Sequence, residues 1–429
     1  MVKFIDLFCG TGGIRLGLEK AFQSVGVETK CVFSAEIDKN ACETYELNFS
    51  ENPYCDVRDL NDIEDFDVLL AGFPCQSFSY AGKQLGFADT RGTLFFEVER
   101  LLKKYKPKIA FLENVRGLTT HDKGRTFKTI LKSLTDIGYK VQFRLINSSN
   151  YGIPQKRVRI YIIATLGYEP IINIPSDLGA IDSHNFELYS SQISCFNEYS
   201  FKVVKDILED NPDEKYDCSE WFVERLKAVL KGDLDKLHGK RLIDTRHGNS
   251  IHSWDIGIKG LCSEDEIFFM NSLISNMRKK IFGTHQDGKA LTINQIRTFY
   301  SNPNIEEVIS SLLEKGYLSN KNDKLNPVCG NMSFEVFKFL DPSSISITLT
   351  ASDSNRLGVY YNGRVRRLTP RECARLQGYP DSYVLNPVDV FAYKQLGNAV
   401  SVPVISKLFN DFIEHNHDFI RGIIEIKNS

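Results

Sequence analysis

The stretch Asp6-Leu7-Phe8-Cys9-Gly10-Thr11-Gly12-Gly13 decides the fold. It lies between an apolar run, Lys3–Phe8, and a helical pattern, Ile14–Gln23. Glycines at a strand-to-helix turn let the backbone turn tightly and approach a ligand closely. Arg15 stands where dinucleotide-binding proteins have their third glycine, so the turn does not predict a nicotinamide oxidoreductase.

Strand and helix patterns alternate outward from this turn. The further expected strands are Cys31–Ala35, Asp67–Gly72, Lys108–Glu113, Val141–Ile146 and Arg159–Ala164, and the further expected helices are Thr93–Tyr105 and Arg125–Ile137. This alternation predicts an α/β fold with a doubly wound, mostly parallel sheet. Ligands of such sheets bind beyond the carboxyl ends of the strands.

Two acidic residues stand where a cofactor would need them. Glu36 ends the second expected strand, where an acid typically hydrogen-bonds ribose hydroxyls. Asp56 ends the next short run and is placed to accept from an adenine amino group. Each acid taken alone could be an ordinary solvated loop residue, but together with the glycine turn they favour an adenosyl cofactor.

The alternation stops after about Thr165. We expect a catalytic and cofactor-binding domain in residues 1–165, an inserted irregular domain in 166–345 and a return to the first domain in 346–429. Within the insertion, Thr292 to Gln295 fits a capping box, and apolar residues from Ile305 to Leu313 recur at helical spacing. Residues 290–325 are therefore a candidate winged-helix-like element, although an ordinary helical hairpin would give the same pattern.

Composition excludes several classes of protein. The chain has 429 residues, a net charge of −2 and ten cysteines. No Cys-x-x-Cys pair occurs, which argues against a zinc site or a disulfide framework, and no metal is expected. There is no apolar run of membrane-spanning length and no signal-peptide pattern, so we expect a soluble, cytoplasmic monomer.

Cys75 and Glu113 are the candidate reactive groups. Cys75 follows Gly72-Phe73-Pro74 just past one strand, and Glu113 ends the next. Because the carboxyl ends of parallel strands meet at one edge of a sheet, the two side chains can meet. A thiolate that attacks C6 of a pyrimidine, with an acid at N3, makes C5 nucleophilic enough to take a methyl group from a sulfonium. Otherwise Cys75 would be a small buried apolar residue and Glu113 a structural acid.

The ordered set of motifs resembles the bacterial cytosine-C5 DNA methyltransferases of restriction-modification systems. The motifs cover most of the chain outside residues 165–345; they are Phe8-x-Gly10-x-Gly12, Glu36, Asp56, Pro74-Cys75-Gln76, Glu113-Asn114-Val115, Gln155-Lys156-Arg157-Val158-Arg159, Arg367-Leu368-Thr369-Pro370-Arg371-Glu372 and Gly397-Asn398-Ala399-Val400. The resemblance implies the S-adenosylmethionine-dependent methyltransferase fold, with an inserted target-recognition domain. Asn398 implies that the last helices pack back on the first sheet.

The resemblance also implies individual roles. Cys75 matches the nucleophile, Glu113 the acid at cytosine N3, and Arg157 and Arg159 the residues that position the base. The positions that match S-adenosylmethionine contacts are Phe8, Gly10, Gly12, Glu36, Ile37, Asp56, Val57, Pro74, Leu94, Asn398 and Val400.

Double-stranded DNA is the expected partner, with a cognate restriction endonuclease in the same system. A target base inside a duplex must flip out to reach a thiol in a cleft. The expected DNA contacts are Gln76, Ser79, Arg91, Arg241, Arg246, His247, Asn249, His252 and Lys279. Some are side chains that read base edges and others are phosphate contacts, although any one of them could be a solvated surface residue. The family often fills the vacated stack with a small polar residue, but Ala81 stands there.

Two other functions share parts of this pattern. A tRNA cytosine-C5 methyltransferase has the same Pro-Cys and Glu-Asn-Val motifs, but those proteins tend to have a shorter middle region. A non-catalytic DNA-binding protein would not need an intact Cys75 and Glu113. Both features favour the DNA methyltransferase.

Overall fold

The computed structural model describes residues 1–74, 94–176, 202–245, 248–283, 289–330 and 333–425. The chain divides into two compact units. The first contains Met1–Ile207, Ile345–Ser354 and Pro370–Ser429, and the second contains Leu208–Ser344 and Asn355–Thr369.

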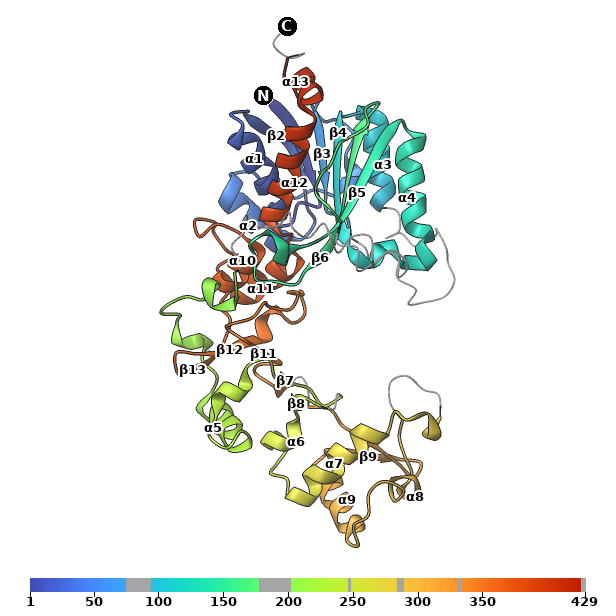
Figure 1. Ribbon diagram of the computed structural model, residues 1–429, viewed down its shortest axis with the longest axis vertical. Helices are drawn as coiled ribbons and strands as arrows, with labels where there is room; N and C mark the ends of the chain where they lie inside the picture. The colour runs from blue at the N-terminus through green and yellow to red at the C-terminus, as the bar shows by residue number, and fades with distance from the viewer. Residues whose placement is uncertain (75–93, 177–201, 246–247, 284–288, 331–332, 426–429) are drawn as a thin grey trace. The chain divides into compact units, whose positions relative to one another are not determined.

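A six-stranded sheet forms the centre of the first unit, with strand order β2-β1-β3-β4-β6-β5 (Figure 1). β1, β2, β3 and β4 are mutually parallel, and β6 runs antiparallel to both β4 and β5. The elements before the insertion are β1 Val2–Leu7, α1 Gly13–Ser24, β2 Thr29–Ala35, α2 Lys39–Phe49, β3 Val68–Ala71, α3 Leu94–Tyr105, β4 Ile109–Val115, α4 Arg125–Asp136, β5 Tyr139–Asn147 and β6 Val158–Leu166. All the expected strands and helices of this part are confirmed, while α2 was not predicted.

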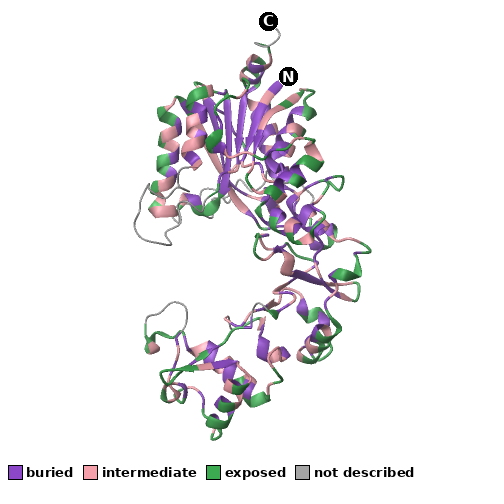
Figure 2. Cartoon of the chain, turned by 180° about the vertical axis from the view of Figure 1, so that it is seen from behind, coloured by how far each residue is buried: buried purple, intermediate pink, exposed green. Residues whose placement is uncertain are grey.

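Helices cover both faces of this sheet, and its four inner strands β1, β3, β4 and β6 are buried along most of their length (Figure 2). Because strand side chains alternate between faces, Phe4 and Phe111 belong to one core cluster and Ile5 and Leu112 to the other. α1 packs on the first face and α3 and α4 on the second. The fold class predicted from the sequence is thus confirmed.

The C-terminal part of the chain forms α10 Pro370–Gln377, α11 Asp389–Asn398, α12 Val402–His415 and α13 His417–Glu425. α12 and α13 return to the first face of the sheet, as expected. Phe409 of α12 stacks on Phe111 of β4, with 4.7 Å between ring centroids. α12 also lies against α1, where a Cβ on Gly17 would come within 2.5 Å of Ile405. Glycine is therefore required for this close helix packing.

The second unit has a smaller five-stranded sheet with the order β13-β12-β11-β7-β8. Its elements are α5 Glu220–Val229, β7 Arg241–Leu242, β8 Ser250–Ile251, α6 Ser253–Ile256, α7 Glu264–Asn276, α8 Ile293–Ile296, α9 Ile305–Glu314, β9 Leu318–Lys321, β10 Lys324–Pro327, β11 Lys338–Leu340, β12 Leu357–Tyr361 and β13 Arg364–Arg367. Phe222 of α5 and Phe339 of β11 lie in the core beside this sheet.

The limits of the units differ from the expected 166 and 345. Ile172 and Ile174 are buried in the core of the large sheet, so the first unit continues past residue 166. β12 pairs with β11, and β13 pairs with β12, so residues 355–369 belong to the second unit. The β11–β12 pairing joins segments that are not adjacent in sequence, and apolar periodicity carries no trace of it.

A second core in this unit lies among α7, α8, α9 and the β9–β10 hairpin. The expected capping box is present, because the Thr292 and Gln295 side chains each bond the other residue's backbone N–H. Leu291 forms an antiparallel bridge to Leu325 of β10. Along the chain, the order is α7, the bridge at Leu291, α8, α9 and the β9–β10 hairpin. The winged-helix interpretation requires this order of elements.

Candidate active site

The candidate site is built at one end of the large sheet. Leu7, the last residue of β1, pairs with Ala35 of β2 and with Ala71 of β3. Ala71 in turn pairs with Leu112 of β4. The segments that follow these strands therefore emerge together, and they carry the glycine turn, Glu36, Phe73-Pro74 and Glu113.

The glycine turn leaves room for a ligand at one glycine and is tightly packed at the next. Phe8 and Gly10 both have positive φ, 54° and 52°. A Cβ built on Gly10 would meet nothing within 4 Å, whereas one on Gly12 would lie 2.3 Å from the Phe49 ring. Gly12 is therefore required by packing, and Gly10 borders open space.

Glu36 is held in place by backbone groups. Its carboxylate accepts hydrogen bonds from the N–H of Gly10 at 2.9 Å and from those of Ile37 and Asp38, both at 2.8 Å. The carboxylate is thus fixed beside the open space at Gly10, with lone pairs left for a further donor. Ile37 is 65 % exposed and offers apolar surface next to it.

The remaining expected cofactor residues differ in burial and in their contacts within the chain. Asp56 caps a short helical turn and pairs with Arg58, which lowers the pKa of its carboxyl. Val57 is buried in the core, and its expected cofactor contact stays a prediction. Pro74 and Asn398 are exposed, and Leu94 is half-buried at the start of α3. Val400 is buried, and a Cβ on Gly13 would meet it at 2.7 Å.

Glu113 and Arg159 form an ion pair within the site. Because β6 is antiparallel to β4, Glu113 pairs with Tyr161 and Val115 with Arg159. Glu113 Oε1 lies 3.4 Å from Arg159 Nε, and both side chains are largely buried. Burial raises the pKa of the Glu113 carboxyl, although Arg159 and Arg157 lower it in part. The acid therefore keeps its proton to a higher pH than an exposed glutamate.

Arg157 plays a different part from Arg159. It is 2 % exposed, and its guanidinium donates to the carbonyl oxygens of Leu349, at 3.0 Å, and Ala399. Burial lowers the pKa of Arg157 to about 9. Arg157 therefore joins β6 to two segments that follow the insertion, which supports the site rather than presenting a cation to it.

Two supporting amides were not among the expected site residues. Asn114 Nδ2 donates to the carbonyl oxygen of Phe73 at 2.8 Å and so fixes the chain two residues before Cys75. Gln155, fully buried, donates to Leu376 O and accepts from Leu349 N. Both residues lie inside quoted motifs, and this was the one signal in the sequence that could have identified them.

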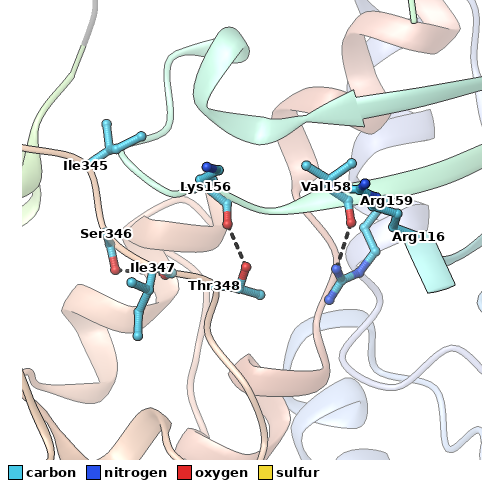
Figure 3. A pocket seen from close by; sticks show the side chains of 8 residues that line it. All are labelled: Arg116, Lys156, Val158, Arg159, Ile345, Ser346, Ile347 and Thr348. Atoms are coloured by element: carbon cyan, nitrogen blue, oxygen red, sulfur yellow. Dashed lines mark hydrogen bonds between the residues drawn. The ribbon is translucent and has the colours of Figure 1, made fainter. Parts of the chain in front are cut away.

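A cavity of about 410 Å³ opens beside Arg159 (Figure 3). Arg116, Lys156 and Arg159 bring positive charge to its lining. On the other side lie the backbone and side chains of Ile345 to Thr348, where the Thr348 hydroxyl bonds the Lys156 carbonyl. The cavity is therefore cationic, and it lies next to the buried acid.

The expected DNA contacts in the second unit differ in how far their side chains are exposed. Arg241 is half-buried on β7, Asn249 accepts from Lys240, and Lys279 is exposed. His252 is only 4 % exposed, because its ring stacks on Trp254 and its Nδ1 bonds Asp255 at 2.9 Å. His252 is the N-cap of α6, and its expected contact with a base edge stays a prediction.

Several expected site residues lie outside the described residues: Cys75, Gln76, Ser79, Arg91, Arg246 and His247, together with the rest of the Ser77–Asp89 loop. In the part of the chain that the structure describes, no group of acidic, histidine and cysteine side chains could hold a metal ion. No helix among those residues is long and apolar enough to cross a membrane.

Comparisons with known proteins identify relatives of the chain. The chain is 59 % identical to the Type II methyltransferase M.BanI of Aneurinibacillus aneurinilyticus, over 100 % of this chain and 99 % of that protein. It is 58 % identical to M.HgiCI of Herpetosiphon aurantiacus, over 96 % and 98 %. A putative DNA modification methyltransferase from an E. coli prophage has the same fold, with a TM-score of 0.52, 20 % identity and coverage of 96 % and 99 %.

The family model for C-5 cytosine-specific DNA methylases matches residues 2–414, nearly the whole chain. The chain therefore belongs to this family and is a DNA (cytosine-5) methyltransferase.

Proposed function

We propose that the chain transfers a methyl group from S-adenosylmethionine to C5 of a flipped-out cytosine within a specific double-stranded DNA sequence. The proposal includes a transient covalent bond between Cys75 and C6 of the base. The observation that carries it is the buried Glu113–Arg159 pair at the end of β4, beside a cationic cavity. Membership of the family supplies the reaction class.

The glycine turn fits the methyl donor. Open space at Gly10 lies next to the fixed Glu36 carboxylate, which suits ribose hydroxyls, and next to the exposed Ile37, which suits a flat adenine ring. Phe8 and Asn398 complete the proposed set. When bound, S-adenosylmethionine supplies an electrophilic methyl group, and the residues of the chain hold and orient it.

Cys75 and Glu113 activate the base. The Cys75 thiolate forms an Sγ–C6 bond, while Glu113, whose pKa is raised by burial, donates a hydrogen bond or its proton to N3. The negative charge that would build up in the ring is therefore neutralised, and C5 becomes nucleophilic. Arg159 orients the Glu113 carboxyl and presents a donor to the carbonyl oxygen of the base.

The reaction then returns the enzyme to its starting state. C5 forms a bond to the methyl carbon as the bond from that carbon to sulfur breaks. The hydrogen on C5 leaves as a proton to solvent, and its bonding electrons form the C5–C6 double bond. The Sγ–C6 bond breaks, its electron pair returns to Cys75 as the thiolate, and a proton given to N3 returns to Glu113. No electrons are gained or lost overall, so the cycle needs no redox partner.

A duplex cytosine reaches this site only after leaving the stack, at a cost of a few kcal/mol. The cations of Arg116 and Lys156 suit the phosphates of such an extruded nucleotide. The second unit is the proposed target-recognition domain. Relatives at 59 % and 58 % identity are named Type II methyltransferases, which supports a role as the modification half of a restriction-modification system.

A trapping experiment tests the covalent mechanism and the substrate together. The purified chain is incubated with methyl-tritiated S-adenosylmethionine and duplex DNA that contains 5-fluorocytosine, in EDTA. Because fluorine cannot leave C5 as a cation, the Sγ–C6 bond persists, and we expect a labelled protein–DNA adduct. Sequencing the trapped DNA then gives the target site.

The matched control is Cys75→Ser, which should bind cofactor and DNA but give no adduct. An adduct with 5-fluorocytosine tRNA and none with DNA would refute the DNA substrate. Methylation of ordinary DNA by Cys75→Ser would refute the covalent step.

A further inference from the structure

The turn that follows α7 presents an apolar side chain among cations. Ile281 is 82 % exposed, more than any other large apolar side chain in the described residues. The three residues before it, Arg278, Lys279 and Lys280, are all exposed. We refer to Arg278–Phe282 as the basic turn. An apolar side chain this exposed adds little to the core, and here it stands among three exposed cations, so it is available for contact with a partner.

The basic turn has a fixed shape. Phe282 packs edge-on against Phe299, with 5.9 Å between ring centroids. Lys289 is 7 % exposed, and its ammonium donates to the carbonyl oxygens of Lys279, at 3.1 Å, and Gly283. Gly283 has a φ of 122°, which favours glycine. The position of Ile281 is therefore set before any partner binds, which lowers the entropy lost on binding.

The three cations of the basic turn have no acidic partner among the described residues. No described acid forms an ion pair with Arg278, Lys279 or Lys280. Elsewhere in the same core region, Lys315 pairs with Glu266. Cations after a helix favour the negative end of its dipole, but that effect does not account for the exposed Ile281.

The other exposed element of this region has the wrong charge for DNA. α9 buries Ile305, Val308, Ile309 and Leu312. Its outward residues include Glu306, Glu307 and Glu314, which are exposed. Carboxylates on that surface would repel the phosphates that line a groove, so α9 is a poor groove-binding helix.

We propose that the basic turn is a DNA-docking element of the second unit. Lys279 and Lys280 contact phosphates, and Ile281 makes an apolar contact with base edges or a base step in the groove between them. The inference rests on the proposed function, in which the second unit engages target DNA, and it names the element that does so. Phosphate contacts position the duplex, and the apolar contact adds affinity that salt does not screen.

The first test is Ile281→Ser in the full-length chain, with Leu261→Ser as the control. Leu261 lies in the same unit, is 63 % exposed and is outside the basic turn. Binding is measured by fluorescence anisotropy on a duplex that contains the trapped site. We expect Ile281→Ser to weaken DNA binding about ten-fold, equivalent to about 1.4 kcal/mol, at an unchanged melting temperature and cofactor Kd. Leu261→Ser should remain within two-fold of wild type.

The second test separates phosphate contacts from general charge. Lys279→Ala should reduce the slope of log K against log salt by about 0.9, the effect of one lost phosphate contact. Lys227→Ala, in which the lysine removed pairs with Glu224 on α5, should leave the slope unchanged. Ile281→Ser should lower affinity equally at all salt concentrations.

Two failures are distinguishable. If wild type binds and methylates DNA while Ile281→Ser and Lys279→Ala match it in affinity and salt slope, the basic turn does not dock DNA and the inference is overturned. If wild type itself forms no DNA adduct, the proposed function fails first, and the inference falls with it.

Discussion

Glu113 and Arg159 face each other across two antiparallel strands, with 3.4 Å between Oε1 and Nε. Both are largely buried, and burial raises the pKa of Glu113 while Arg159 lowers it. The arrangement therefore holds an acid that is oriented by a cation and still able to carry a proton. That combination is what protonation of a pyrimidine nitrogen requires.

We predict that Glu113→Gln slows methyl transfer by about 100- to 10,000-fold, because the amide can donate a hydrogen bond but cannot give up a proton. Cofactor Kd should stay near the wild-type value, since the proposed contacts of the donor are with Glu36 and the glycine turn. The measurement is single-turnover methylation beside calorimetric titration with S-adenosylmethionine. Glu97→Gln, which loses an ion pair with Arg100 on α3, is the control and should retain full activity. If Glu113→Gln weakened cofactor binding as much as it slowed methyl transfer, the assignment of Glu113 as the acid at N3 would be wrong.

Asn114 is predicted to act as a positioning residue. Because its amide donates to Phe73 O, Asn114→Ala should lower kcat about ten- to a hundred-fold, with a smaller change in KM for DNA and cofactor. Asn114→Asp should be slower still, since a carboxylate would then face a carbonyl oxygen. Steady-state kinetics of the two variants check this. If Asn114→Asp and Asn114→Ala gave the same kcat, the hydrogen bond donated by Asn114 would not be the cause of the loss in rate.

Local chemistry made the first sheet predictable from the sequence. A glycine turn and an apolar run depend mainly on residues that are neighbours in sequence. The strands around Gly10 and Gly12 could therefore be predicted. Side-chain roles that depend on tertiary contacts did not follow. His252 is polar in sequence but buried against Trp254, and Val57 is buried in the core of the sheet. The role of Asn114 depends on a carbonyl 41 residues away, which no local pattern contains.

The open space at Gly10 gives a matched pair of variants. Gly10 and Gly26 both have positive φ, 52° and 73°, and a Cβ on either would meet nothing within 4 Å. Alanine at each position should therefore cost a similar, small amount of stability, about 1 kcal/mol. Only Gly10→Ala should weaken cofactor binding, by about ten-fold or more, because its methyl group enters the proposed cradle.

Thermal unfolding and calorimetric titration measure the two effects separately. Equal cofactor affinity in Gly10→Ala and Gly26→Ala would mean that the donor lies elsewhere. A loss of affinity in both would point to a general effect of backbone strain.

Asp6 gives a prediction about pH. Its side chain is fully buried at the end of β1, and neither carboxyl oxygen has a hydrogen-bond partner among the described residues. Burial raises the pKa of Asp6 to about 8; Arg15 lowers it, and Glu19, Glu36 and Glu51 raise it further. The folded chain therefore holds a neutral acid at neutral pH.

The sign of the effect follows from linkage. Between pH 3.8, the ordinary pKa of the group, and about 8, the folded state binds more protons than the unfolded state, so stability falls as pH rises through this window. Asp6→Asn, which mimics the neutral acid, removes this loss. We expect the variant to match wild type at acidic pH and to exceed it in free energy of unfolding by a growing margin up to about pH 8. Urea unfolding at several pH values measures the difference, with Asp136→Asn on the exposed side of α4 as the control. Parallel pH curves for wild type and Asp6→Asn would mean that the carboxyl is already ionised in the fold and finds a stabilising partner there.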